Sequence, residues 1–198
     1  MFSSTDSFYN SQIDSGAMTT GPTCVGGTTL PFDHVVARME IRPATVDDRD
    51  RIRAVARDAW HDTYDDLEAD LIDETIDDWY GDESFEQALE KPGTAVLVAE
   101  RDGDLVGFTH GVVSEEEGDV LRMYVHPDHQ GEGIGTALHE RLREDLEDIN
   151  MKRMRAIDLE SNDASREFYE DLGFEQTDEA EVELGDETHT EAVYTLEL

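Results

Sequence analysis

Apolar residues in the middle of the chain follow two different spacings. Residues 120–125 form a short apolar run of the kind found in buried strands, and after a turn one apolar residue recurs at every fourth position from 134 to 146. The second spacing places its side chains on one face of a helix. This stretch therefore predicts a strand, a glycine-rich turn and an amphipathic helix. The members of the helical stripe are Ile134, Ala137, Leu138, Leu142, Leu146 and Ile149.

Before this stretch the pattern predicts a strand around Ile41 and a helix that Thr45 or Asp47 can cap. The apolar stripe of that helix continues to Trp60, and acidic helical residues follow up to Tyr80. Strands are expected at 95–100 and 105–112, joined by a tight turn at 102–103. Residues 114–118 are expected to form a solvated loop.

After the stretch, strands are expected at 154–159, 174–184 and 188–196, the last two joined at 185–186. Asp163 can cap a short helix, and Gly173 can supply the left-handed residue that ends it. Antiparallel hairpins then flank one strand–helix–strand crossover. The chain is predicted to fold as α+β.

The turn before the central helix has the composition of a phosphate site. Residues 130–135 read Gln-Gly-Glu-Gly-Ile-Gly, and a glycine-rich turn leading into a helix N-terminus presents backbone N–H groups to an anion. The spacing is not that of a P-loop, because Thr136-Ala137 follows the last glycine instead of Lys-Ser or Lys-Thr. It also lacks the third glycine of a dinucleotide fingerprint.

Two motifs, about thirty residues apart, resemble those of the GCN5-related N-acetyltransferases. The first is Gln/Arg-x-x-Gly-x-Gly/Ala at 130–135. The second is Asn-x-x-Ala-x-x-Phe-Tyr-x-x-Leu-Gly-Phe at 162–174, with Ser165 where alanine is commoner. The resemblance implies a mixed, mostly antiparallel sheet of six to seven strands, with a V-shaped splay between residues 120–125 and 154–159, flanked by about four helices.

The resemblance also implies that acetyl-CoA is the acyl donor, with pantetheine between the splayed strands and the pyrophosphate on the N–H groups of the glycine turn. The N–H of Val125 is the implied oxyanion donor, and Tyr169 the acid for the leaving thiolate. Asp119 is the candidate general base, with Glu116, Glu117, Tyr124 and His126 as further options. Residues expected to bind the donor are Met123, Tyr124, Val125, Gln130, Gly131, Glu132, Gly133, Ile134, Gly135, Thr136 and Asn162.

Trp60 and Tyr64 lie where this family shapes its acceptor pocket, although two aromatics four residues apart on a helix are equally typical of packing. The expected function is N-acetylation of a primary amine by direct attack, the acceptor being a small cationic amine, a polyamine or a protein amine. The alternative is an acetyl-CoA-binding sensor or interaction module with little catalysis. Asn162 can equally end a strand.

The composition is strongly acidic. The 198 residues include 50 acidic and 15 basic side chains, for a net charge of −35 at pH 7. Such a chain repels nucleic acid, whose phosphates attract Lys and Arg. The regular apolar periodicity argues against disorder. We therefore predict a halophilic, acidic protein that works in concentrated salt, where the Debye length is about 3 Å or less and self-repulsion is screened.

Residues 1–38 are rich in Ser, Thr and Gly and lack the basic and apolar regions of a secretory signal. They are expected to be a disordered extension or the result of a start assigned too early, with a single acetyltransferase domain at 39–198. The lone Cys24 excludes an internal disulfide and fits a cytoplasmic protein. No apolar run approaches the ~18 residues of a membrane span.

His126 and His129 form an H-x-x-H pair without a third ligand at matching spacing, so no metal is expected. The assembly state is left open, a homodimer included.

Overall fold

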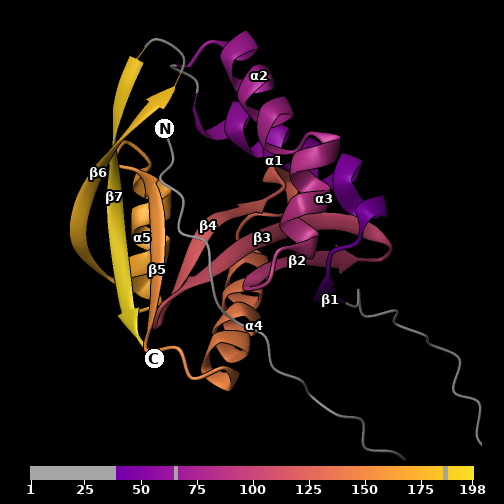
Figure 1. Cartoon of the computed structure of the whole chain (residues 1–198). Helices are drawn as coiled ribbons and strands as arrows, with labels where there is room; N and C mark the ends of the chain where they lie inside the picture. The colour runs from indigo at the N-terminus through magenta and orange to yellow at the C-terminus, as the bar shows by residue number, and fades with distance from the viewer. Residues whose placement is uncertain (1–38, 65–66, 185–186) are drawn as a thin grey trace, which may run out of the picture. The chain divides into compact units, whose positions relative to one another are not determined.

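The computed structural model describes residues 39–198 except 65–66 and 185–186. The expectations for residues 1–38, Cys24 included, and for the turn at 185–186 lie outside the described residues. The described strands form one seven-stranded sheet in the order β1-β2-β3-β4-β5-β7-β6 (Figure 1). The strands are β1 Met39–Pro43, β2 Thr94–Arg101, β3 Asp104–Ser114, β4 Glu117–Val125, β5 Arg153–Leu159, β6 Glu175–Leu184 and β7 Glu187–Glu197.

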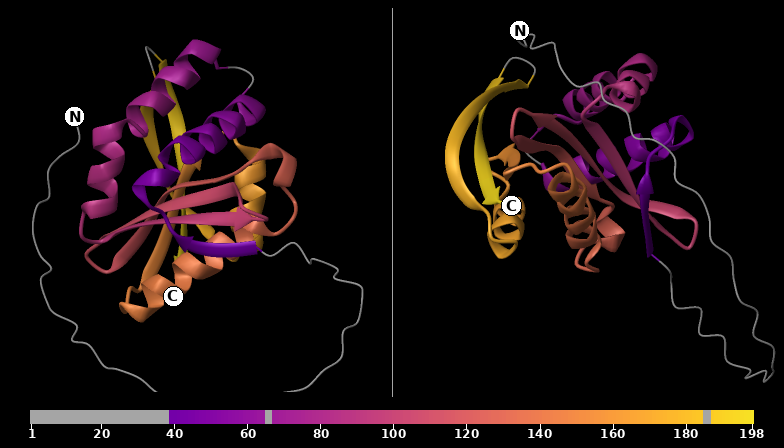
Figure 2. Two further views of the ribbon diagram at one scale, coloured as in Figure 1. Left: turned by 90° about the vertical axis from the view of Figure 1, so that its right-hand side faces the viewer. Right: turned by 60° about the horizontal axis from the view of Figure 1, so that its bottom comes forward.

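Five α-helices of the described residues cover the sheet on both faces (Figure 2). Alternation along β2 produces this arrangement, because successive side chains point to opposite faces. Val96 and Val98 pack with α1, α2 and α3. Leu97 and Ala99 pack with α4 and α5. The helices are α1 Arg49–Thr63, α2 Ala69–Trp79, α3 Asp82–Glu90, α4 Ile134–Asp148 and α5 Asp163–Asp171, with short 3₁₀ turns η1 Val46–Asp48 and η2 Pro127–His129.

The one parallel pairing of the described sheet is also where it opens. β4 and β5 pair only from Glu117 opposite Arg153 to Val120 opposite Ala156. Beyond Val120, β4 stays paired with β3 and β5 stays paired with β7. A β-bulge at Leu121, where the β3–β4 register shifts, bends β4 at this point. The predicted α+β fold with its splay is confirmed.

Several local predictions need correction. Residues 114–118 are not a loop, because β3 continues to Ser114 and β4 begins at Glu117, leaving a two-residue turn in which Glu115 has φ 57°. Helix α3 was not predicted, although Phe85 and Leu89 have helical spacing. Ile149 leaves the stripe, with 53% of its surface exposed, because α4 ends at Asp148.

The caps also differ in part from prediction. Thr45 begins η1 with a capping box in which Asp48 is the partner. Asn162, not Asp163, caps α5, because its side-chain oxygen accepts a hydrogen bond from the Ser165 N–H at 3.0 Å. Gly173 has φ 90° just after this helix, as predicted.

Candidate functional site

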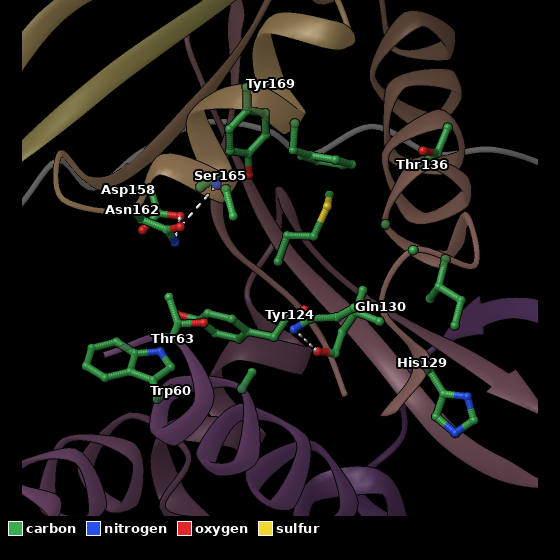
Figure 3. Close-up of a pocket in the computed structure, with 18 of the residues that line it drawn as sticks. Trp60, Thr63, Tyr124, His129, Gln130, Thr136, Asp158, Asn162, Ser165 and Tyr169 are labelled. Atoms are coloured by element: carbon green, nitrogen blue, oxygen red, sulfur yellow. Dashed lines mark hydrogen bonds between the residues drawn. The ribbon is translucent and has the colours of Figure 1, made fainter. Parts of the chain in front are cut away.

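The gap between β4 and β5 leads into a cavity of about 490 Å³. Its walls come from the C-terminal end of α1, the end of β4, the turn before α4, the end of β5 and the first turns of α5. In Figure 3 the side chains of Trp60, Thr63, Asp158 and Asn162 lie on one side of the hollow, and those of Thr136 and His129 on the other. The cavity therefore has two chemically different ends.

The end beside α4 is lined by unpaired backbone donors. The first backbone hydrogen bond at the start of α4 runs from the Ala137 N–H to the Gly133 carbonyl, at 3.0 Å. None of the six N–H groups of residues 131–136 donates to an acceptor in the described part of the chain. Gly131 and Gly133 have φ of 74° and 80°, and a Cβ added at either would meet nothing within 4 Å. This turn is an open site for an anion.

The exposed edge of β4 adds further donors in the gap. The His126 N–H donates to the Val106 carbonyl at 2.9 Å, and Tyr124 is paired with Phe108. Because successive N–H groups of a strand point to opposite sides, those of Met123 and Val125 point away from β3 and into the gap. The side chain of Gln130 reaches the Val125 carbonyl at 3.4 Å.

Tyr169 lies in α5 with only 5% of its surface exposed. Its ring stacks on Tyr194, with centroids 5.6 Å apart, and makes edge contacts with Phe168 and Phe174. The hydroxyl makes no hydrogen bond to any described residue and points into the cavity (Figure 3). Burial raises the pKa of Tyr169 well above its usual range, so the hydroxyl stays protonated and available as a donor.

The opposite end of the cavity holds a polar cluster around Asp158, at the end of β5. The Tyr64 hydroxyl donates to Asp158 at 2.9 Å, and the Asn162 amide donates to the same carboxylate at 3.2 Å. Burial raises the pKa of Asp158, while hydrogen bonds from Ser165, Tyr64 and others act in the opposite direction. Burial also raises the pKa of the neighbouring Tyr124 to about 12.

Residues 52–174 match the model of the Acetyltransferase (GNAT) family. The chain belongs to this family. An acetyltransferase of Pectobacterium atrosepticum is 34% identical over 94 residues, which is 48% of this chain and 67% of that protein. An acetyltransferase of Yersinia pestis is 33% identical over the same shares of the two chains.

Solved structures of GNAT proteins have the same fold. The PaiA N-acetyltransferase of Thermoplasma acidophilum, in complex with coenzyme A, has a TM-score of 0.68 and 23% identity, covering 78% of this chain and 98% of that one. The ribosomal-protein-S18-alanine N-acetyltransferase of Escherichia coli has a TM-score of 0.64 and 18% identity, covering 81% and 94%. At these identities the likeness concerns the fold alone.

The GNAT fold brings most of the predicted site residues to one cavity. Trp60 lies in α1, and Tyr64 follows directly after this helix. Both side chains are buried, and their rings are in edge contact with centroids 5.1 Å apart. They therefore pack against each other and also line the cavity. The other predicted residues that line the cavity are Met123, Tyr124, Val125, Gln130, Gly131, Gly133, Ile134, Gly135, Thr136, Asn162 and Tyr169.

Two predicted residues lie elsewhere. Asp119 lies in the part of β4 that is still paired with β5, with Arg155 Nε 3.6 Å from its carboxylate, and lines a separate hollow near the end of α4. The opening of the sheet begins only after Val120, and Asp119 does not line the cavity, so it is not placed to act as the general base there. Glu132 pairs with Arg101 and, at 3.2 Å, with His129, and does not line the cavity.

Of the other candidate bases, Tyr124 lines the cavity, whereas Glu116, Glu117 and His126 do not. Glu117 pairs with Arg153 at 2.7 Å and Arg155 at 3.1 Å, and His126 faces Asp58 at 3.4 Å. Asn162 uses its side chain to cap α5 and to contact Asp158 and Tyr64. Sequence reasoning missed Asp158. Its one signal was a carboxylate among the apolar residues that end a strand, four residues before Asn162.

The described residues contain no group of three or more His, Cys, Asp or Glu placed to hold a metal ion. None of the described helices is both long enough and apolar enough to cross a bilayer.

Proposed function

We propose that this GNAT protein is an acetyl-CoA-dependent N-acetyltransferase in which a primary amine attacks the thioester directly. The observation that carries the proposal is the row of unpaired N–H groups at residues 131–136, all of which except Glu132 line the cavity. A diphosphate is the ligand whose charge and size suit such a row. The coenzyme A complex of the related PaiA fold supports acetyl-CoA as the donor.

The remaining cavity residues have roles that fit this reaction. The N–H groups of Met123 and Val125 would pair with the amides of pantetheine, and that of Val125 would stabilise the oxyanion, which is worth about 3 kcal/mol for one such donor. The free Tyr169 hydroxyl would donate its proton to the leaving thiolate, an effect of roughly 10²–10⁴-fold. A residue that only supported the fold would not need a free hydroxyl in the cavity.

The test combines protein, acetyl-CoA and a panel of amines while free thiol is followed. Thiol release that requires both the protein and an amine is the expected result, together with coenzyme A binding in calorimetry. Binding without amine-dependent thiol release would favour an acetyl-CoA-binding module over an enzyme.

We further propose that residues 39–198 are the functional domain and that the protein works in concentrated salt in the cytoplasm. The net charge of −35 supports the second point, because self-repulsion of this size is relieved by screening. A small-molecule amine and a protein amine both remain acceptors to be tested, as does a homodimer.

A further inference from the structure

The Asp158 cluster has no role in binding the donor as proposed above. It lies at the end of the cavity opposite the glycine turn, on the same side of the hollow as Trp60 and Thr63 (Figure 3). The inference drawn from it rests on the proposed function and extends it to the acceptor.

The carboxylate of Asp158 is held in one orientation by donors from three elements. One oxygen accepts from the Tyr64 hydroxyl at 2.9 Å and from the Leu159 N–H at 2.8 Å. The other accepts from Asn162 Nδ2 at 3.2 Å. Asn162 is fixed in turn by its cap to α5. These bonds stabilise the ionised form and leave the carboxylate facing the cavity.

Asp158 has no cationic partner in the part of the chain that the structure describes. None of the ion pairs among the described residues involves it, whereas the buried carboxylate of Asp48 is paired with Arg42 at 2.7 Å. Removing a carboxylate from water without a counter-charge is costly. The open cavity is the direction from which a cation can reach Asp158.

The cavity thus has opposite electrostatic ends. Backbone N–H groups line the end beside α4, and an unpaired carboxylate lines the end beside α1 and β5. Ala59 and the ring of Trp60 give the second end an apolar wall. An anionic ligand would bind at the first end, and a cationic ligand with a carbon chain at the second. The reactive groups of the two ligands would then meet in the middle of the cavity, near Tyr169.

We propose that Asp158 receives the acceptor as an aliphatic primary ammonium ion and takes the proton that it must lose before it attacks the thioester. Tyr64 is the positioning residue that holds the carboxylate, and the carbon chain of the acceptor lies against Trp60.

The protons balance over the whole reaction. The ammonium gives one proton to Asp158 and becomes a neutral amine, whose nitrogen forms a bond to the thioester carbon. The carbon–sulfur bond breaks, and the thiolate takes the Tyr169 proton. The second nitrogen proton returns to Tyr169 through water, and Asp158 releases its proton to solvent. The products are the amide and the free thiol, with one proton released.

Several titratable groups face Asp158 from the surrounding elements. They are tyrosines except for Glu191 on β7, whose pKa is raised by burial and by Asp158. The tyrosines stay neutral at ordinary pH, so Asp158 and Glu191 are the groups that titrate. These neighbours are Tyr64 from the end of α1, Tyr124 from β4, Tyr169 from α5, and Glu191 and Tyr194 from β7.

The first test compares Asp158→Asn with the wild type on two acceptors. Butylamine, with a pKa near the ~10.4 of lysine, is almost entirely cationic at neutral pH. Trifluoroethylamine is largely neutral there. The variant should lose about 10²–10⁴-fold in kcat/KM on butylamine and less than about tenfold on trifluoroethylamine. Coenzyme A affinity should change less than about twofold. Asp119→Asn, the same chemical change outside the cavity, should leave both rates near wild type.

The second test uses Tyr64→Phe and keeps the inference testable if Asp158→Asn does not fold. Loss of the hydroxyl removes one bond to the ionised carboxylate, which raises the pKa of Asp158 further. The acid limb of kcat/KM against pH should move to higher pH on butylamine. An unmoved limb overturns the inference.

Other outcomes are equally decisive. Equal losses on both amines in Asp158→Asn would show a structural role, and a loss below about threefold would show no role. The wild type is also tested on three amines: butylamine, a lysine peptide with a blocked N-terminus, and a lysine-free peptide with a free N-terminus. If it binds coenzyme A but acetylates none of them, the inference is overturned while the donor site stands. The amine that is acetylated shows whether the acceptor is a small molecule, a lysine side chain or a peptide N-terminus. Absence of coenzyme A binding would instead refute the proposed function.

Discussion

Replacing Gly133 by Asp or by Asn separates charge from shape at the glycine turn. The two side chains have the same size, and a Cβ at Gly133 meets nothing within 4 Å, so neither should clash with the protein. Both must adopt the left-handed conformation of φ 80°, which costs about 1 kcal/mol in stability, and Asn and Asp tolerate it better than most residues. The two variants therefore differ in one negative charge at the mouth of the anion site.

The size of the charge effect follows from Coulomb's law. If the diphosphate lies on residues 131–136, the carboxylate introduced by Gly133→Asp would lie about 5 Å from a phosphate charge. At an effective dielectric constant of about 20 or somewhat more, the repulsion is about 2–3 kcal/mol. Gly133→Asp should therefore bind coenzyme A roughly 30- to 150-fold more weakly than Gly133→Asn.

Calorimetric titration with coenzyme A measures the ratio, at low salt and at about 1 M KCl. The ratio should shrink in the higher salt, because the Debye length falls to about 3 Å. Thermal melts of the two variants should agree, which shows that folding is not the cause. Equal affinities of the two variants at low salt would refute the placement of a diphosphate on this turn.

Three further predictions concern the hydroxyl in the cavity, one buried ion pair and the net charge. Tyr169→Phe should lower kcat by about 10²–10³-fold with donor affinity nearly unchanged, and an unchanged kcat would exclude Tyr169 as the acid. Hydrogen bonds from Arg42 hold the pKa of Asp48 far below its usual range, so this pair stabilises the fold above about pH 4 and loses its effect as the pH falls further. Asp48→Asn should cost about 3 kcal/mol at neutral pH in urea unfolding, and equal losses at acid and neutral pH would contradict the reasoning. The melting temperature should rise between dilute and molar KCl, and no change would count against the salt proposal.

The main elements were predictable from local patterns. The four-residue spacing of Ile134, Leu138, Leu142 and Leu146 predicted α4, and all four side chains are buried. The glycine turn was predictable for a related reason, since its φ values and its freedom from side chains depend on residues adjacent in sequence. Spacing within a helix or a turn depends only on residues close together in the chain, so it can be read from the sequence alone.

The carboxylate that lines the cavity was not predictable in this way. Asp119 and Asp158 both lie in the strands that splay apart, and both are carboxylates among 50 acidic residues. Only the register of β4 on β5 decides between them, because pairing ends at Val120 and leaves Asp119 on the closed side of the opening. Local pattern does not contain this register.

The amino-acid sequence alone determined the fold class, the family motifs and the excess of negative charge, since each depends on composition or on residues close together in the chain. The tertiary structure decided which carboxylate faces the cavity and which hydroxyl is left free. Asp158 meets Tyr64 across 94 positions of sequence, and this contact exists only because β5 and the end of α1 pack beside the same gap. A contact of that kind depends on how distant elements pack, and no spacing along the chain records it.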